Sequence, residues 1–170
     1  MGVKACSLVV LVSWLLVSCQ QSTVPINAAS ILQTSKGGDF RGIRLGDKPS
    51  SIKREEEASS VYSMPDELIY RFDSGETDST WYEISYSFNQ DGLNHINLDV
   101  FPQGETLENH LYNEFLDYYN QRYGACRDFS NHKEWRGLTV QGLYVMVSLT
   151  REPARNGRQH LRLVFNETNP

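Results

Sequence analysis

Apolar and polar residues alternate along three successive stretches in the first half of the chain, residues 68–72, 81–88 and 93–101. In the second stretch Tyr82, Ile84 and Tyr86 share one face, because successive side chains of a strand point to opposite faces. Asp91-Gly92 separates the second stretch from the third, and this dipeptide between alternating runs is typical of a hairpin turn. The pattern predicts an antiparallel sheet with one buried face.

Helical spacing marks two further segments. Leu111 and Phe115 belong to a series of apolar residues that recurs every three or four positions and predicts a helix over residues 106–123. A shorter and more polar helix is expected over residues 48–57, with Pro49 in its first turn, where the missing N–H of proline costs nothing. The two predicted helices precede the two groups of strands.

The second half of the chain repeats the order of the first. Three more strands are predicted, over residues 133–135, 138–150 and 159–165, and Asn156-Gly157 marks the turn into the last of them. Two successive helix–three-strand units indicate a degenerate internal duplication. The expected fold is α+β, with two helices packed on one face of an antiparallel sheet.

The first nineteen residues have a different pattern. A single basic residue, Lys4, precedes an uncharged apolar run that is shorter than the roughly 20 residues a transmembrane helix needs. The run ends in Leu16-Val17-Ser18-Cys19, which resembles a lipobox, the processing motif of bacterial lipoproteins. The resemblance implies a signal peptide over residues 1–18 and acyl chains on Cys19. An ordinary secretory signal that is cut near Cys19 is the alternative.

The segment after Cys19 is polar and has no sustained period. Residues 19–39 are interpreted as the lipidated cysteine and a flexible tether, and residues 40–170 as a single α+β domain. The formal net charge of the chain is −5, which argues against nucleic acid as a partner, since binding to phosphate backbones requires basic patches. The same negative charge argues against electrostatic adhesion to anionic lipid, so we expect attachment to the membrane through the acyl chains on Cys19 alone.

No pattern of a catalytic or metal site is found. The four histidines, His95, His110, His132 and His160, lack the spacing of a zinc site, so neither a metal nor a cofactor is expected. Cys126 follows the end of a predicted helix, where the negative end of the helix dipole disfavours a reactive thiolate. These observations predict a protein that is not an enzyme.

The face of the predicted sheet opposite the core carries candidate binding residues. Trp81, Phe101, Tyr144 and Met146 are expected to point outward among small polar residues. Aromatic residues and methionine are enriched at protein–protein interfaces, so these four are predicted to contact a partner protein. The alternative is that a loop covers this face or that Trp81 only packs at an edge.

A resemblance to a known family follows from the N-terminal half. The lipobox, the polar segment after it and Gly42-Ile-Arg-Leu-Gly46 before a helix resemble small envelope lipoproteins of the SmpA/OmlA type, with a β-lactamase-inhibitor-protein-like fold. The resemblance implies a lipid-anchored scaffold or assembly factor that binds an envelope protein. Its expected location is the outer membrane, facing the periplasm. A periplasmic inhibitor or immunity-type protein and an envelope hydrolase are the alternatives.

Overall fold

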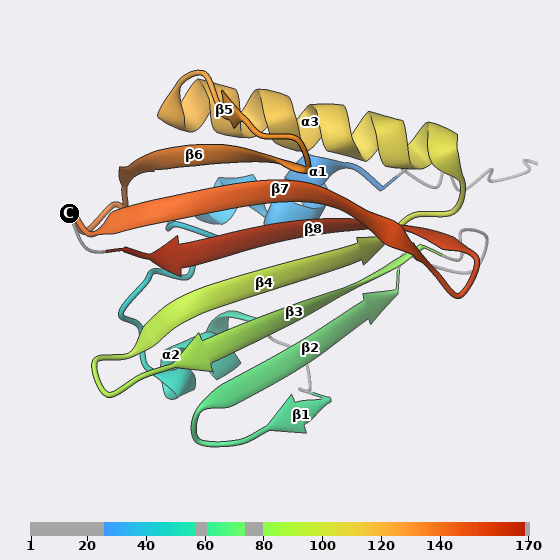
Figure 1. Cartoon of the computed structure of the whole chain (residues 1–170). Coiled ribbons are helices and arrows are strands. Elements are labelled where there is room, and N and C mark those ends of the chain that lie inside the picture. The colour runs from blue at the N-terminus through green and yellow to red at the C-terminus, as the bar shows by residue number, and fades with distance from the viewer. Residues whose placement is uncertain (1–25, 57–60, 74–79, 169–170) are drawn as a thin grey trace, which may run out of the picture.

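A long antiparallel sheet forms the centre of the computed structural model, which describes residues 26–56, 61–73 and 80–168 (Figure 1). Within these residues the sheet has eight strands in the order β1-β2-β3-β4-β8-β7-β6-β5. Their bounds are β1 (Tyr62–Ser63), β2 (Glu67–Asp73), β3 (Trp81–Phe88), β4 (Leu93–Phe101), β5 (Arg127–Asp128), β6 (His132–Leu138), β7 (Tyr144–Arg155) and β8 (Arg158–Glu167).

The strand order is symmetric about the pair formed by β4 and β8. Each half of the chain forms an up-and-down meander, and the last strands of the two meanders pair antiparallel, with Leu98 opposite Leu163. Each meander has one strand more than the three expected, because β1 and β5 add two-residue strands at the two edges. The predicted mixture of helix and antiparallel strand is thus confirmed, and the sheet dominates it.

The helices are α1 (Ala28–Leu32), η1 (Thr34–Lys36, a 3₁₀ turn), α2 (Pro49–Glu55) and α3 (Glu105–Tyr123). In Figure 1, α1 and α2 lie behind the sheet and α3 runs above β6. The helix predicted over residues 106–123 begins one residue earlier and ends where expected. Gly124 follows it with φ of 86°, in the left-handed region that glycine tolerates best, and its N–H donates to the carbonyl of Asn120.

The inner face of the sheet and the helices form one hydrophobic core. Ile84 and Tyr86 of β3 are fully buried, as the alternation predicted, and they join Leu111 and Phe115 of α3 in a single cluster. The polar tip of a buried aromatic residue also has a partner. The indole N–H of Trp135 donates to Oδ1 of Asn120 over 3.0 Å, which links β6 to α3.

The segment interpreted as a flexible tether, residues 19–39, is ordered in the part that the structure describes. Ala28–Leu32 form helix α1, and Ile31 and Leu32 are buried in the core. The backbone N–H of Ala28 donates to Oε2 of Glu114 over 2.8 Å, which fastens α1 to α3. Five residues are too few for a helical period to stand out in the sequence, so the start of the domain at residue 40 was placed too late. Residues 19–25 lie outside the described residues.

The strand predicted over residues 138–150 begins later, at Tyr144, and Leu138 is the last residue of the preceding strand β6. A turn over residues 139–143 separates β6 from β7. Oγ1 of Thr139 accepts hydrogen bonds from the N–H groups of Gln141 and Leu143, over 3.2 and 3.0 Å, and Gly142 has φ of 81°. A threonine that bonds its own following backbone and a glycine with positive φ together close a tight turn. Apolar residues continue through this turn, so the hydrophobic pattern of the sequence did not indicate it.

Gly46 and Gly92 bring the segment before α2 against the β3–β4 hairpin. The N–H of Gly46 donates to the carbonyl of Leu93 over 2.7 Å. A Cβ atom at Gly92 would lie 2.3 Å from the carbonyl oxygen of Gly46, so the close approach requires glycine. The Gly42–Gly46 stretch thus has a structural role in this chain, where it docks onto the hairpin.

Candidate functional site

The open face of the sheet, opposite the core, carries all four residues predicted to contact a partner. Trp81 and Phe101 lie at one end of this face, and Tyr144 and Met146 lie at the other. The distance between the two ends follows from the register. Met146 is opposite Asn166, which pairs with His95, and His95 lies six positions before Phe101 on β4. At about 3.3 Å per residue, roughly 20 Å separates the two pairs. The two pairs of residues therefore belong to two separate parts of the open face.

At the first end a ladder of stacked side chains crosses four strands. Trp81 of β3 and Phe101 of β4 are register partners, and their ring centroids lie 3.9 Å apart at an interplanar angle of 20°. The ring of His160 on β8 stacks on Phe101 at 4.5 Å, and the guanidinium of Arg71 on β2 lies 4.1 Å from the centre of the Trp81 ring. Phe101 is only 3% exposed, so it supports Trp81 and offers little surface of its own.

Asp99 holds the polar side of this stacked ladder in place. Its Oδ1 atom lies 2.6 Å from Nε2 of His160 and accepts from Nε of Arg162 over 2.8 Å. Its Oδ2 atom accepts from the amide of Asn97 over 2.6 Å. Three donors thus surround the Asp99 carboxylate, and these partners within the sheet compensate its negative charge.

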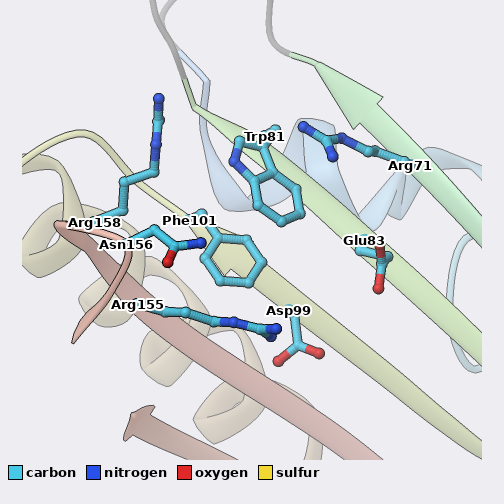
Figure 2. A pocket seen from close by; sticks show the side chains of 8 residues that line it. All are labelled: Arg71, Trp81, Glu83, Asp99, Phe101, Arg155, Asn156 and Arg158. Atoms are coloured by element: carbon cyan, nitrogen blue, oxygen red, sulfur yellow. The ribbon is translucent and has the colours of Figure 1, made fainter. Parts of the chain in front are cut away.

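A pocket of about 320 Å³ opens beside the stacked ladder (Figure 2). Its walls come from β2, β3, β4 and the β7–β8 hairpin, and they consist of Arg71, Trp81, Glu83, Asp99, Phe101, Arg155, Asn156 and Arg158. Figure 2 shows the carboxamide of Asn156 directed toward the Phe101 ring and the side chain of Arg155 extending toward Asp99. Asn156 and Gly157 both have positive φ, so the predicted turn is present and places these side chains over the pocket.

A second, shallower hollow follows the open face toward the middle of the sheet. It has a volume of about 400 Å³, and small polar side chains such as Ser85 and Ser87 form part of its floor. Oδ1 of Asn97 is buried there and has no hydrogen-bond partner within the described part of the chain. His95 closes one side, with Nδ1 2.6 Å from Oδ1 of Asn166.

The other end of the open face is apolar and exposed. Tyr144 is 49% exposed and is the register partner of Leu138, which is 56% exposed. Val140, in the turn between them, is 59% exposed, and Met146 lies half-buried beside Tyr144 on the same face. These four residues are called the Tyr144 patch below. Leu138 and Val140 were missed in the sequence, because the turn that exposes them was read as strand.

The largest pKa changes lie inside the core, away from the open face. Burial raises the pKa of the Tyr86 phenol well above its usual value, and the Glu56 carboxylate beside it raises that pKa further. Tyr86 donates a hydrogen bond to Glu56, which also pairs with the guanidinium of Arg41 at 2.9 Å. Arg41 and Glu56 are each almost inaccessible to solvent, so this network fastens α2 to the sheet and is closed to a ligand.

No metal centre is found in the described ranges, since none of their histidine, cysteine, aspartate and glutamate side chains gather in a group of three that could hold an ion. Cys126 is a half-buried free thiol. Within the same ranges, no helix is both long and apolar enough to cross a membrane. Cys19 and the signal peptide predicted over residues 1–18 lie outside them.

Comparison of the chain with protein families, with curated proteins and with solved structures gives no match. The resemblance to envelope lipoproteins therefore stays a prediction, and the open face of the sheet is the observation from which a function can be argued.

Proposed function

We propose that the protein is a lipid-anchored component of the bacterial cell envelope that binds another protein through the Tyr144 patch. The exposed apolar surface of Leu138, Val140 and Tyr144 is the observation that carries the binding part of the proposal. Contiguous apolar residues on the surface of a folded domain are typical of an interaction site. The resemblance of residues 16–19 to a lipobox supports the lipid anchor, and the resemblance of the N-terminal half to envelope lipoproteins supports a location at the outer membrane, facing the periplasm.

The chemistry of the patch suits a protein partner. Tyr144 offers a rigid aromatic ring with a polar hydroxyl, which is a frequent anchor of protein interfaces. Leu138 and Val140 add aliphatic surface whose burial contributes about 25 cal/mol for each Å² removed from water. Arg136, the register neighbour of Met146, is exposed and pairs with Glu134 over 2.9 Å, so the rim is polar and its charges are balanced. A partner with an apolar centre and a polar rim would fit this surface.

We further infer that the two halves of the chain descend from one duplicated unit, in which a helix covers one face of a meander. The symmetric strand order, with β4 and β8 at the centre and the two-residue strands β1 and β5 at the edges, supports this inference. In each half a helix precedes the meander, α2 before β1 and α3 before β5.

Site-specific crosslinking in intact cells tests the binding function. A photoreactive amino acid replaces Tyr144 or Val140 in separate strains, and in the control it replaces Gln121, an exposed residue of α3. We expect one discrete envelope-protein adduct from both patch positions and none from the control. An adduct that forms equally at Gln121, or no adduct at either patch position, would contradict the proposal.

The anchor is tested independently. Labelling with an alkyne analogue of palmitate is expected to mark the natural chain, and a Cys19→Ser variant is expected to lose the label and to leave the membrane fraction. A Cys6→Ser variant provides the matched control and should keep the label. Retention of the label in Cys19→Ser would mean that the lipid is attached to a residue other than Cys19, and it would leave the proposed binding site unaffected.

A further inference from the structure

We propose that the shallow hollow in the middle of the open face binds a protonated primary amine. The hollow has a volume of about 400 Å³ and lies between the two ends of the face that carry Trp81 and Tyr144. Binding of an amine there is a second function for the open face, and it does not depend on the protein partner of the Tyr144 patch.

The charges around the hollow favour a cation. The carboxylate of Glu67 lines the hollow and makes no ion pair or side-chain hydrogen bond with another residue in the part of the chain that the structure describes. The guanidinium of Arg162, which lines the hollow from β8, is held by the carboxylates of Asp99 at 2.8 Å and Glu152 at 3.4 Å. The uncompensated charge of this lining is therefore negative. The net charge of the chain, −5, has the same sign, and both attract a cation.

Hydrogen-bond acceptors predominate in the lining. Glu67, Ser87 and His95 are register neighbours in one row across β2, β3 and β4. Nδ1 of His95 donates to Oδ1 of Asn166, because an amide oxygen can only accept, so Nε2 of the neutral ring keeps its lone pair. The row thus offers a carboxylate, a hydroxyl and an imidazole nitrogen to a ligand that donates hydrogen bonds.

The floor of the hollow contains a further acceptor. Oδ1 of Asn97 is buried and has no hydrogen-bond partner among the described residues. Nδ2 of the same side chain donates to Oδ2 of Asp99 over 2.6 Å, so the carboxamide cannot exchange its oxygen for its nitrogen without losing this bond. A buried acceptor without a donor is unfavourable. An N–H group of a ligand would supply the donor, directly or through one water molecule.

A primary ammonium group matches this lining. It combines one positive charge with three N–H donors on a compact head, so it can bond at once to the carboxylate of Glu67 and to the hydroxyl of Ser85 or Ser87. A quaternary ammonium has no N–H donor and is held by aromatic faces instead. The described lining of the hollow contains no phenylalanine, tyrosine or tryptophan, so the primary amine is the better fit.

The test is an NMR titration of the purified full chain in a non-ionic detergent, followed at the backbone N–H groups of Ser85 and Asn97. The probe is butylammonium. Butanol is its neutral counterpart, and tetramethylammonium has the charge but no N–H donor. We expect saturable shifts with butylammonium and binding at least about tenfold weaker with the other two probes. A tenfold change corresponds to about 1.4 kcal/mol, which is less than a hydrogen bond to a charged group contributes.

The variant that tests the site is Glu67→Gln, which removes the charge and keeps the size of the side chain. Glu105→Gln is the matched control, since Glu105 is an exposed carboxylate in the first turn of α3. The first is expected to lose at least about tenfold in affinity for butylammonium, and the control is expected to keep it. An unchanged spectrum away from the hollow shows that Glu67→Gln is folded.

Four results would each overturn the proposal. They are equal binding of butanol or of tetramethylammonium, unchanged affinity in Glu67→Gln, a loss of the same size in Glu105→Gln, and the absence of saturable shifts with butylammonium.

A lysine side chain of another protein and a free small amine present the same ammonium group, so a further arm identifies the source. Photocrosslinking at Tyr144 is repeated in strains that carry Glu67→Gln or Glu105→Gln. Loss of the adduct in Glu67→Gln alone would identify a lysine of the partner protein as the natural ligand, and an unchanged adduct would identify a free amine. If the natural chain gives no adduct, the function proposed for the Tyr144 patch fails, and the titration still decides the amine site.

Discussion

Arg41 and Glu56 form a salt bridge that is sealed from solvent, with Nη2 of Arg41 2.9 Å from Oε2 of Glu56 and both side chains 1% exposed. Tyr86 donates to the same carboxylate from β3, and the guanidinium of Arg41 lies 4.7 Å from the centre of the Phe72 ring. The pair thus connects the segment before α2, the end of α2 and two strands. A charge left without its partner at this place would remain buried, since nothing in the geometry opens the site to water.

Replacement of Glu56 by alanine is expected to lower the free energy of unfolding by about 3–5 kcal/mol, because the guanidinium of Arg41 would be buried without its counter-charge. Guanidinium chloride denaturation, followed by tryptophan fluorescence, measures this loss. Glu55→Gln is the matched control, since Glu55 makes only a peripheral ion pair with the exposed Arg54, and it should change the free energy by less than about 1 kcal/mol. Equal effects of the two substitutions would show that the buried network contributes little.

Stability is expected to fall at alkaline pH. Burial raises the pKa of Tyr119 and of Tyr86 well above 10, the value for an exposed tyrosine. The folded state therefore holds these protons more tightly than the unfolded chain. Each phenol stabilises the folded state, and this contribution is fully present below about pH 10. Above pH 10 the contribution of each phenol to the free energy of unfolding falls by about 1.4 kcal/mol per pH unit, until the pH reaches the folded-state pKa. Urea denaturation at pH 8 and at a series of values above pH 10 should reveal the slope.

The Tyr119→Phe variant tests the origin of this slope. It should show a shallower decline above pH 10 than the natural chain, because one buried phenol no longer titrates. Tyr86→Phe is a less clean choice, since it also removes the hydrogen bond to Glu56. An unchanged slope in Tyr119→Phe would mean that other groups cause the alkaline loss.

The approach of Gly92 to Gly46 predicts a large effect of a single methyl group. Gly92→Ala would place Cβ 2.3 Å from a backbone oxygen, and φ at this residue is 134°. We expect the free energy of unfolding to fall by about 3 kcal/mol or more, because backbone must move to relieve the clash. Chemical denaturation measures the change.

Gly104→Ala separates the clash from the backbone strain. Gly104 also has positive φ, 84°, but a Cβ atom there would meet no atom within 4 Å. This control should cost about 1–3 kcal/mol, the strain of combining φ of 84° with ψ of 162° in a residue with a side chain, and less than Gly92→Ala. A control that costs as much as Gly92→Ala would contradict the role assigned to the contact with Gly46.

Phe101 is expected to contribute to stability more than to binding. Phe101→Leu would keep apolar volume between Trp81 and His160 but would remove both ring stacks, each worth about 0.5–1.5 kcal/mol. The expected loss is about 1–3 kcal/mol in denaturation, with a change in the fluorescence of the folded state as Trp81 loses its neighbour. A double-mutant cycle with Trp81→Leu measures the coupling, and a coupling near zero would contradict the stack.

The alternation of residues was sufficient to predict six of the strands and the buried faces of four of them, β3, β4, β7 and β8. Tyr86 and Ile84 point inward as expected, because a strand with one wet face leaves a period of two in its sequence. The same pattern failed at residues 138–150, where apolar residues continue through a turn. Hydrogen bonds of Thr139 and the positive φ of Gly142 decide that turn, and both are local features that a hydrophobic pattern does not report.

The candidate site was harder to predict than the fold. Alternation correctly placed Trp81 and Tyr144 on the outward face, but it carries no information on where along that face each residue lies. Their separation depends on the register of β4 with β8 and of β8 with β7, which is set by pairings between distant segments. The pocket beside Trp81 depends in addition on the reach of the β7–β8 hairpin, which brings Arg155 and Arg158 to strands that are remote in the sequence.

The strand order also determines when the sheet can form during synthesis of the chain. The last strand of the chain, β8, occupies the middle of the sheet, where it joins β4 to β7. Contacts such as that of Leu98 with Leu163 close a long loop, and such non-local pairings slow folding. Until residues 158–167 are available, each meander has an unpaired edge that invites association with other chains. A protein synthesised from its N-terminus therefore stays open along its centre until residues 158–167 have been made, and deletion of these residues would divide the sheet into two halves.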